Sequence, residues 1–193
     1  MAGAGGLLKR LSDIVFSTIA LMCLSPVLCV IAIAIHFDSP GPIIFRQRRV
    51  GAHGREFTMW KFRTMKIGTP DIPTHLLTHP DRLITRVGRW LRRTSLDELP
   101  QLVNILGGRM SVVGPRPALY NQMDLIAMRK AKGIDVLRPG LTGWAQINGR
   151  DDLTLVEKVE WEAEYMRRWS LLFDVYIVAK TIGQAISGRG VRA

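Results

Sequence analysis

The chain is 193 residues long, with 47% hydrophobic, 22% charged and 7% aromatic residues. This mixture excludes intrinsic disorder and fibrous repeats, and the length suits one catalytic domain with an appendage rather than two ordinary enzyme domains. The 27 basic residues outnumber the 16 acidic ones, for a net charge of +11. Such an excess indicates an anionic partner: nucleic acid, an anionic membrane surface or a phosphorylated substrate. The two cysteines lie in one apolar stretch, which excludes a disulfide framework.

The first long feature is an apolar run at residues 14–37, 24 residues without Asp, Glu, Lys or Arg. At about 1.5 Å per residue, a straight helix of that length reaches roughly 36 Å, enough to cross a bilayer. A cleaved signal peptide is the weaker alternative, because the apolar part of a signal sequence is only about 7–15 residues long. The run therefore predicts a helix inserted in the membrane, with Cys23 and Cys29 as small side chains facing lipid.

Two details bear on how this helix meets the membrane. Ser25-Pro26 lies near its middle, and a proline there removes a helical hydrogen bond and bends the helix. Basic residues flank both ends, Lys9 and Arg10 before the run and four arginines at residues 46–55 after it. Basic flanks favour the cytoplasmic side. A crossing helix and a re-entrant helix that returns to its side of entry are both compatible with these two facts.

The remaining elements follow a turn-rich linker at residues 39–42, which divides the chain into residues 1–38 and 39–193. Strands are predicted at residues 43–49 and 56–62, as a hairpin, and helices at residues 81–93, 97–106, 118–130, 153–169 and 171–187. Two glycine- and proline-rich loops are predicted at residues 107–117 and 138–150. His75 and His79 have the spacing of helical metal ligands, but prolines bracket them, which favours a solvated loop.

The positive charge is uneven along the chain. Before residue 38 there are two basic residues and one acidic residue, so +10 of the +11 belongs to the later part. Residues 46–66 contain seven basic residues and one acidic residue, and residues 82–93 contain five and none. Basic runs are usually solvated surfaces. Because the first run directly follows a membrane segment, contact with lipid headgroups is an equally good interpretation.

The dipeptide Asp97-Glu98 has a structural and a functional interpretation. Ser95 and Glu98 have capping-box spacing, and Asp97 could itself cap a helix with Pro100 in its first turn. The functional interpretation comes from the arginines nearby. Arg92 lies just upstream, and two more occur in the irregular loops, as Arg116 and Arg138.

Arginine side chains suit phosphate oxygens, and functional sites are often built on loops. A carboxylate beside a helix N-terminus among arginines is expected to stay ionised, and could act as a nucleophile or a ligand of Mg²⁺. These residues alone leave capping and phosphate chemistry both open.

Two blocks carry a resemblance to a known family. LDELPQLVNILGGRMSVVGPRP at residues 96–117 and RPGLTGWAQINGR at residues 138–150 resemble the signature blocks of bacterial sugar transferases, the monotopic polyprenyl-phosphate phosphoglycosyl transferases. Lys9-Arg10 with Asp13, the central Ser-Pro, and the segment at residues 45–65 also match. One position departs from the pattern: where the family usually has an acidic residue before Met-Ser, this chain has Arg109.

The resemblance implies an α+β, mostly helical fold. Residues 1–38 would be a re-entrant membrane helix broken at Ser25-Pro26, and residues 39–193 a small β-hairpin with a helical catalytic domain. It implies the bacterial inner membrane as the location, with the catalytic domain on the cytoplasmic face and membrane lipids as partners. A homo-oligomer is left open.

The resemblance also implies an enzyme that transfers a phospho-sugar from a UDP-sugar to polyprenyl phosphate. Asp97 would attack the β-phosphorus, releasing UMP, and would also touch Mg²⁺. Glu98 would position groups or relay protons, while Arg92, Arg116 and Arg138 would hold phosphates. The alternative is a membrane-tethered, non-enzymatic binding or scaffold protein with a basic face. Nucleic acid is not an expected partner, because the sequence contains no recognisable nucleic-acid module.

Overall fold

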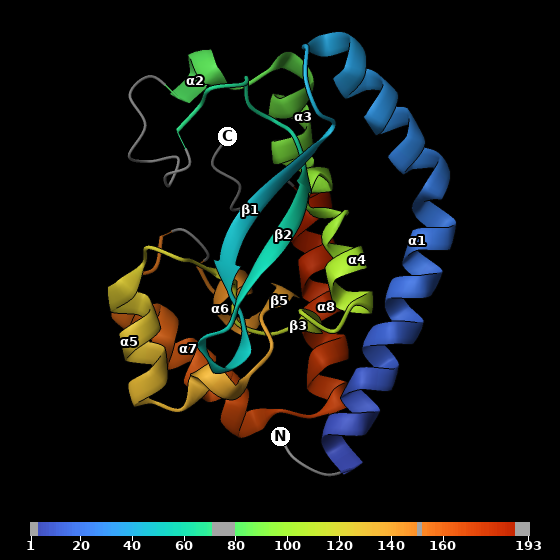
Figure 1. The fold of residues 1–193 in the computed structure, drawn as a ribbon. Coiled ribbons are helices and arrows are strands. Elements are labelled where there is room, and N and C mark those ends of the chain that lie inside the picture. Colours follow the sequence, from blue (N-terminus) through green and yellow to red (C-terminus); the bar gives the residue numbers. More distant parts are fainter. Residues whose placement is uncertain (1–3, 71–79, 150–151, 188–193) are drawn as a thin grey trace.

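A computed structural model describes residues 4–70, 80–149 and 152–187, so the predicted loop around His75 and His79 lies outside the described residues. Figure 1 shows one long helix, α1, along the side of a body made of a β-hairpin and shorter helices. The α-helices are α1 (Ala4–Asp38), α2 (Pro80–Leu83), α3 (Arg86–Thr94), α4 (Gln101–Leu106), α5 (Met123–Ala131), α6 (Trp144–Ile147), α7 (Leu155–Arg168) and α8 (Leu171–Ser187). The strands are β1 (Ile44–Val50), β2 (Glu56–Phe62), β3 (Ser111–Val113), β4 (Ala118–Leu119) and β5 (Gly140–Thr142). The described residues also include the short 3-10 helices η1 (Ala52–Gly54), η3 (Leu96–Glu98) and η4 (Ile134–Val136).

Helix α1 is 35 residues long and continues through Pro26, so the structure does not show the break that was expected at Ser25-Pro26. The hydroxyl of Ser25 donates to the carbonyl oxygen of Met22 at 2.9 Å, just before the proline. Figure 1 shows the helix bowed around the rest of the molecule. Its length and composition would allow it to cross a membrane. Its outward face is apolar and exposed, with Leu7, Leu8, Leu11, Val15, Phe16, Ile19, Met22, Val27, Val30, Ile33 and Phe37.

Both ends of α1 are fixed to the same folded body. Near its start, Arg10 donates to the carbonyl oxygens of Ile105 and Leu106 at 2.5 and 2.6 Å, and thus satisfies the free end of α4. Near its other end, Ile31 and Ile35 are buried together with Phe62 of β2 and Leu91 of α3. The bowed middle of the helix therefore spans two attachment points on one body.

The predicted hairpin is confirmed. Strands β1 and β2 are antiparallel, with Ile44 opposite Phe62 and Val50 opposite Glu56. His53 and Gly54 form its tip with φ of 56° and 70°, values that turn the chain within a few residues. Strand β4 pairs with the other edge of β1, which gives a three-stranded sheet in the order β2-β1-β4.

Three predicted helices begin differently in the structure. The helix predicted at residues 97–106 begins only at Gln101, after the short 3-10 helix η3. The helix predicted at residues 81–93 is split, because Ile84 forms a β-bridge with Met65 and the Thr85 hydroxyl then caps α3 by accepting from the amide of Gly88. Gly88 allows α3 to approach closely, since a Cβ there would lie 2.2 Å from the carbonyl oxygen of Thr64. The helix predicted at residues 118–130 begins only at Met123, because the segment before it pairs with β1.

The two loops predicted at residues 107–117 and 138–150 contain regular structure. Strands β3 and β5 lie in these loops and pair in parallel, with Ser111 opposite Gly140 and Val113 opposite Thr142. The backbones come so close that a Cβ on Gly140 would lie 2.1 Å from the amide nitrogen of Gly114. The two loops are thus held as one unit.

The main core lies between the sheet and the C-terminal helices. Leu102, Ile105, Met110, Val159 and Ile177 are fully buried there, from α4, the following loop, α7 and α8. Helices α7 and α8 match the predictions at residues 153–169 and 171–187, and α7 starts with a capping box formed by Thr154 and Glu157. This core supports α4 and the loops that carry the candidate site.

Candidate active site

Asp97 and Glu98 lie in η3, the short turn between α3 and α4, and both are buried, with 8% of their surface exposed. Ser95 before them adopts a left-handed conformation with φ of 57° and makes no side-chain capping bond. The N-cap position of α4 is Pro100, which also provides no side-chain cap. The capping interpretation of this dipeptide is therefore wrong, and both carboxylates are left for other contacts.

Two cations meet at one oxygen of Glu98. The ammonium of Lys61 donates to Oε1 of Glu98 at 2.9 Å, and a guanidinium nitrogen of Arg116 donates to the same oxygen at 3.0 Å. The three residues come from β2, η3 and the segment between β3 and β4. Glu98 thus orients two positive groups that repel each other, beside Asp97.

Lys61 reaches Glu98 because Asn104 docks α4 on β2. The side-chain nitrogen of Asn104 donates to the carbonyl oxygen of Thr58 at 2.8 Å, and its side-chain oxygen accepts from the amide of Trp60 at 3.0 Å. A buried carboxamide with both bonds made holds the helix in one register. Neither Lys61 nor Asn104 was predicted as a functional residue. A lysine in the otherwise uncharged segment of residues 57–62 was the available signal.

Asp97 has an unusual electrostatic environment. Burial is the largest effect and raises the pKa of its carboxyl group, and the neighbouring Glu98 acts in the same direction. Lys61, Arg92 and Arg116 oppose this rise in pKa. At Asp97, burial therefore favours the protonated carboxyl group, while the nearby cations favour the ionised form. The sequence predicted only the second of these effects, from the arginines.

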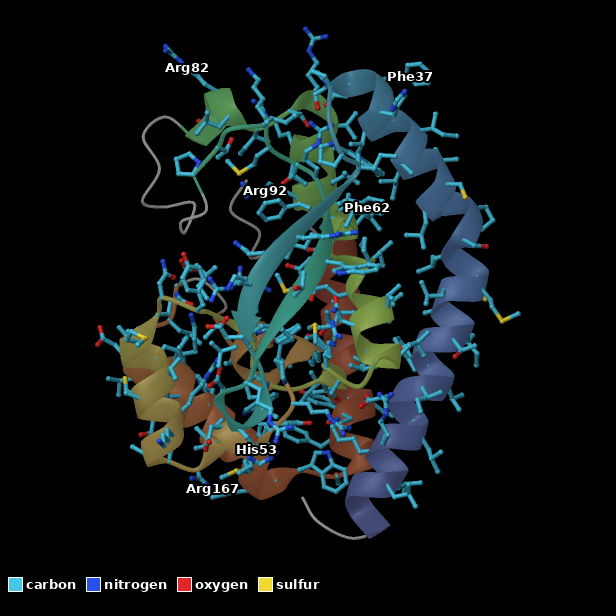
Figure 2. The ribbon with its side chains drawn as sticks, viewed as in Figure 1. Phe37, His53, Phe62, Arg82, Arg92 and Arg167 are labelled. Carbon is cyan, nitrogen blue, oxygen red and sulfur yellow. The ribbon has the colours of Figure 1, made fainter. Side chains whose placement is uncertain are left out.

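The cations of the site are affected by burial and by their neighbours. Burial lowers the pKa of the Lys61 ammonium and of the Arg92 guanidinium, while Asp97 favours the charged form of both. Arg92 lies in the last turn of α3, near the end of the hairpin that is remote from its tip (Figure 2). The backbone of Arg116 is held by Arg129, which donates to the carbonyl oxygen of Arg116 at 2.9 Å. Arg129 also forms a buried ion pair with Glu162.

Arg138, the fifth predicted residue, lies elsewhere. It lines a cavity of about 800 Å³ together with residues of the hairpin tip, and the lining includes none of Arg92, Asp97, Glu98 or Arg116. His53, another lining residue, lies at the tip of the hairpin, at the end opposite to Arg92 (Figure 2). The structure thus brings together four predicted residues, whereas Arg138 lines the cavity at the hairpin tip.

A magnesium ion fits the carboxylate pair only with help from a substrate. Within residues 4–70, 80–149 and 152–187, no group of three or more His, Cys, Asp and Glu residues could hold a metal ion. Mg²⁺ at phosphoryl-transfer sites commonly uses one or two carboxylates, with waters and substrate phosphates as the other ligands. Asp97 suits such a site, because no hydrogen bond to its carboxylate occurs in the described part of the chain.

Two buried carboxylates thus lie among lysine and arginine side chains, in a chain that also has one helix long and apolar enough to cross a membrane. Lysine and arginine side chains of this kind suit phosphate oxygens. Residues 4–188 match the bacterial sugar transferase family, and the chain belongs to this family.

Several curated relatives are similar over almost the whole chain. UDP-glucose:undecaprenyl-phosphate glucose-1-phosphate transferase of Escherichia coli (strain K12) is 48% identical over 94% of this chain, and the match covers 41% of that protein. The uncharacterized sugar transferase EpsL of Bacillus subtilis (strain 168) is 38% identical over 96% of this chain and 91% of its own length. The exopolysaccharide production protein ExoY of Rhizobium meliloti (strain 1021) is 37% identical, with 96% and 88% coverage. The chain thus spans about two fifths of the first relative and most of the other two.

Proposed function

We propose that this protein is a phosphoglycosyl transferase that moves a phospho-sugar from a UDP-sugar to polyprenyl (undecaprenyl) phosphate, as a membrane step in bacterial polysaccharide synthesis. The observation that carries the proposal is the buried Asp97-Glu98 pair with Lys61, Arg92 and Arg116 around it. Family membership and the printed activities of relatives such as the Escherichia coli protein support it. Catalysis of phosphoryl transfer depends mainly on positioning and on neutralising charge, which this arrangement can provide.

The proposed reaction has two displacements at the β-phosphorus. In the first, an oxygen of Asp97 forms a bond to that phosphorus, the bond to the bridging oxygen breaks, and UMP leaves with the electron pair. In the second, a phosphate oxygen of the polyprenyl phosphate bonds to the same phosphorus and the Asp97 carboxylate leaves. The products are UMP and a polyprenyl-diphosphate sugar. A covalent phospho-sugar on Asp97 links the two displacements.

Each side chain around the pair has a proposed task. Arg92 and Arg116 bind phosphate oxygens, and Glu98 keeps Lys61 and Arg116 oriented towards the reacting phosphorus, in line with its two ion pairs. Lys61 and both arginines also favour the ionised, nucleophilic form of Asp97. Mg²⁺, when bound to Asp97 and the substrate, would neutralise charge on the diphosphate.

We further propose that α1 is re-entrant, so that residues 1–38 enter the bilayer and return while residues 39–193 stay on the cytoplasmic face of the inner membrane. The attachment of both helix ends to one polar body supports this geometry. A crossing helix would place its two ends on opposite sides of the bilayer, about 30 Å of hydrocarbon apart. The polyprenyl phosphate would then meet the site at headgroup depth.

The activity is tested with Asp97→Asn, which removes the nucleophile at nearly unchanged volume. We expect no UMP release from UDP-sugars by this variant, with unchanged membrane association. Asp124→Asn, an exposed position in the first turn of α5, is the matched control and should behave as the wild type. Normal UMP release by Asp97→Asn would exclude Asp97 as the nucleophile. Anion binding that depends on salt but not on Asp97 or Glu98 would favour the non-enzymatic scaffold protein.

The re-entrant geometry is tested separately by labelling single cysteines in sealed vesicles. Cys23 and Cys29 are first replaced by alanine, and Ala2→Cys and Pro40→Cys are introduced one at a time. A membrane-impermeant thiol reagent should reach both new cysteines from the same side. Labelling from opposite sides would show that the helix crosses the membrane.

A further inference from the structure

The cavity at the tip of the hairpin is a second concentration of positive charge. Arg55 follows the tip of the hairpin, Arg109 lies in the loop between α4 and β3, and Arg138 lies between η4 and β5. These three segments are far apart in sequence, and all three arginines line one cavity of about 800 Å³. That volume lies within the range of about 300–1,000 Å³ that holds small molecules.

The three arginines are available for a ligand. Among the residues that the structure describes, their guanidinium groups have no hydrogen-bond, ion-pair or ring partner. Of the acidic groups in the lining, Glu56 pairs with Arg48, and Oδ1 of Asp13 accepts hydrogen bonds from Ser111 and Val112. A concave surface lined by unpaired cations concentrates a positive potential, which an anion with several acceptor oxygens would offset.

A second observation concerns the wall of the cavity. Asp13 lines it and is only 3% exposed, and its Oδ2 is buried without a hydrogen-bond partner in the described residues. A buried acceptor left unpaired is unfavourable. Leu7, also in the lining, is 64% exposed, and it belongs to the apolar outward face of α1. The lining therefore suits a ligand that has phosphate oxygens for the arginines and a hydrogen-bond donor for Asp13. The same ligand could also place an apolar part next to Leu7.

We propose that this cavity is a binding site for a phosphate ester that carries hydroxyl or ammonium groups, separate from the carboxylate site. Arg55, Arg109 and Arg138 bind the phosphate, and the hydroxyl or ammonium group donates towards Asp13. Both a phospholipid headgroup and a free phosphate ester have this chemistry. In the lipid case, the acyl chains lie along the exposed face of α1 next to Leu7.

The test measures binding by titration calorimetry to the full chain in micelles of an uncharged detergent. Two probes distinguish the sources: sn-glycerol 3-phosphate for a free ester, and dihexanoyl phosphatidylglycerol for a lipid headgroup. The double variant Arg55→Gln/Arg109→Gln should bind the effective probe about tenfold more weakly, as expected from loss of charge-assisted contacts. Arg86→Gln/Arg167→Gln removes the same charge from exposed positions on α3 and α7 and should stay within about twofold of the wild type.

Each result has a defined meaning. Binding of glycerol phosphate that depends on Arg55 and Arg109 assigns the cavity to free esters, and the same dependence with the lipid alone assigns it to headgroups. The proposal is overturned if neither probe binds, or if both double variants lose affinity equally. The site does not rest on the transferase activity, because Asp97→Asn should leave binding in the cavity unchanged. The four arginines replaced in the double variants are exposed, and circular dichroism checks that all variants, including the buried Asp97→Asn, fold.

Discussion

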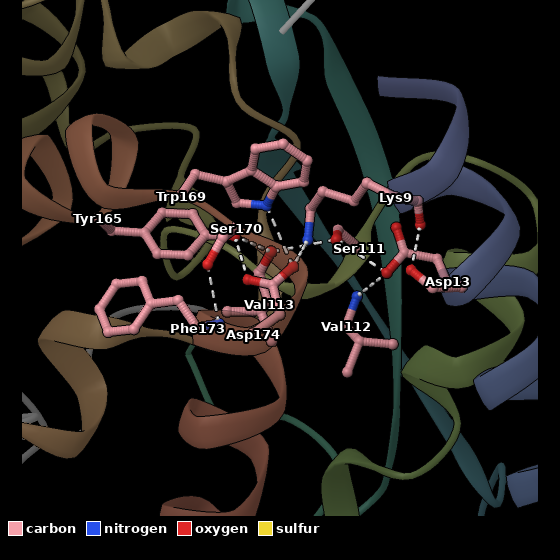
Figure 3. Close-up of polar contacts among 11 residues, drawn as sticks. Lys9, Asp13, Ser111, Val112, Val113, Tyr165, Trp169, Ser170, Phe173 and Asp174 are labelled. Atoms are coloured by element: carbon pink, nitrogen blue, oxygen red, sulfur yellow. Dashed lines mark hydrogen bonds and ion pairs between the residues drawn. The ribbon is translucent and has the colours of Figure 1, made fainter. Parts of the chain in front are cut away.

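The ammonium of Lys9 lies 2.6 Å from Oδ2 of Asp174, which joins α1 to α8 (Figure 3). Asp174 also accepts hydrogen bonds from the hydroxyl of Tyr165 at 2.8 Å and from the indole nitrogen of Trp169 at 3.2 Å. Burial, and then Asp174, raise the pKa of the Tyr165 phenol, so that it remains a protonated donor. The carboxylate of Asp174 therefore binds side chains from α1, from α7 and from the segment between α7 and α8.

Replacing Lys9 by methionine should lower the free energy of unfolding by about 3 kcal/mol, because it leaves the charge of Asp174 buried and unpaired. Both side chains of the pair are only 12% exposed. The double variant Lys9→Met/Asp174→Asn should recover part of the loss. Thermal unfolding in detergent measures both effects. Arg48→Gln, which breaks an exposed pair with Glu56, should change stability little. A Lys9→Met protein as stable as the wild type would show that α1 is held by its apolar contacts alone.

The rate of UMP release should fall at acidic pH. The apparent pKa of this fall in the pH–rate profile should lie above the ordinary pKa of an aspartic acid. Burial raises the pKa of Asp97, and the reaction needs its ionised form, so protonation stops the reaction at a higher pH than for an exposed carboxylate. Lys61 lowers that pKa. Lys61→Gln should therefore move the acidic limb of kcat/KM to still higher pH, while Lys66→Gln, an exposed lysine beyond β2, should not. If the acidic limb of the pH–rate profile does not move in Lys61→Gln, Lys61 does not influence the pKa of Asp97.

Arg116→Gln should reduce kcat/KM for UMP release about a hundredfold, the typical effect of losing one contact that stabilises charge in the transition state. Arg93→Gln, an exposed arginine at the end of α3, removes the same charge and should have a small effect. Steady-state kinetics at constant ionic strength make the comparison. Equal losses in the two variants would mean that only the overall positive charge matters.

Asn104→Asp should cost about 2 kcal/mol of stability and reduce activity. The change replaces the donor to the Thr58 carbonyl by an oxygen that repels it, whereas the bond from the Trp60 amide can persist. Because Asn104 sets the position of α4 on β2, the pairing of Lys61 with Glu98 should weaken as well. Asn121→Asp at an exposed site serves as the control for the added charge. Denaturant unfolding and UMP release are measured on the same preparations, and a variant with lost stability but full activity would contradict the positioning role.

Chelation with EDTA should abolish UMP release without lowering the unfolding temperature. In the proposed site Mg²⁺ is held by Asp97 together with substrate phosphates, so the folded protein without substrate gains little from the ion. Addition of Mg²⁺ should restore the activity. Full activity in EDTA would exclude the metal from the reaction.

Elements whose pattern is local could be predicted from the sequence. The apolar run of α1, the helical periods of α7 and α8, and the alternating strands around residues 51–54 all appear as expected. Strands β3 and β5 were not predicted, because Ser111 becomes a strand residue only by pairing with Gly140. The start of α5 was misplaced for the same reason, since Ala118 pairs with Val50.

The same distinction holds at the candidate site. Asp97, Glu98 and Arg92 lie together because they are close in the chain, and Arg116 joins them across β3. The position of Lys61 depends on how Asn104 docks α4, a contact across 44 residues that no local pattern encodes. Arg138 belongs to a recognisable motif, yet it lines the cavity at the hairpin tip, and the nearby pairing of β5 with β3 joins segments that are far apart in the chain.

The pairing of Lys9 with Asp174 also constrains the order of events during synthesis. The two residues are 165 positions apart, so at about 5–20 residues per second the partner of Lys9 leaves the ribosome on the order of ten seconds later. Throughout that interval α1 lacks Asp174, and during its first part, until β3 is made, α1 also lacks Ser111. The exposed apolar face of α1 is therefore made well before the residue that fixes its start through Lys9. Helix α8, which is made later, then fixes the start of α1 through the ion pair of Asp174 with Lys9.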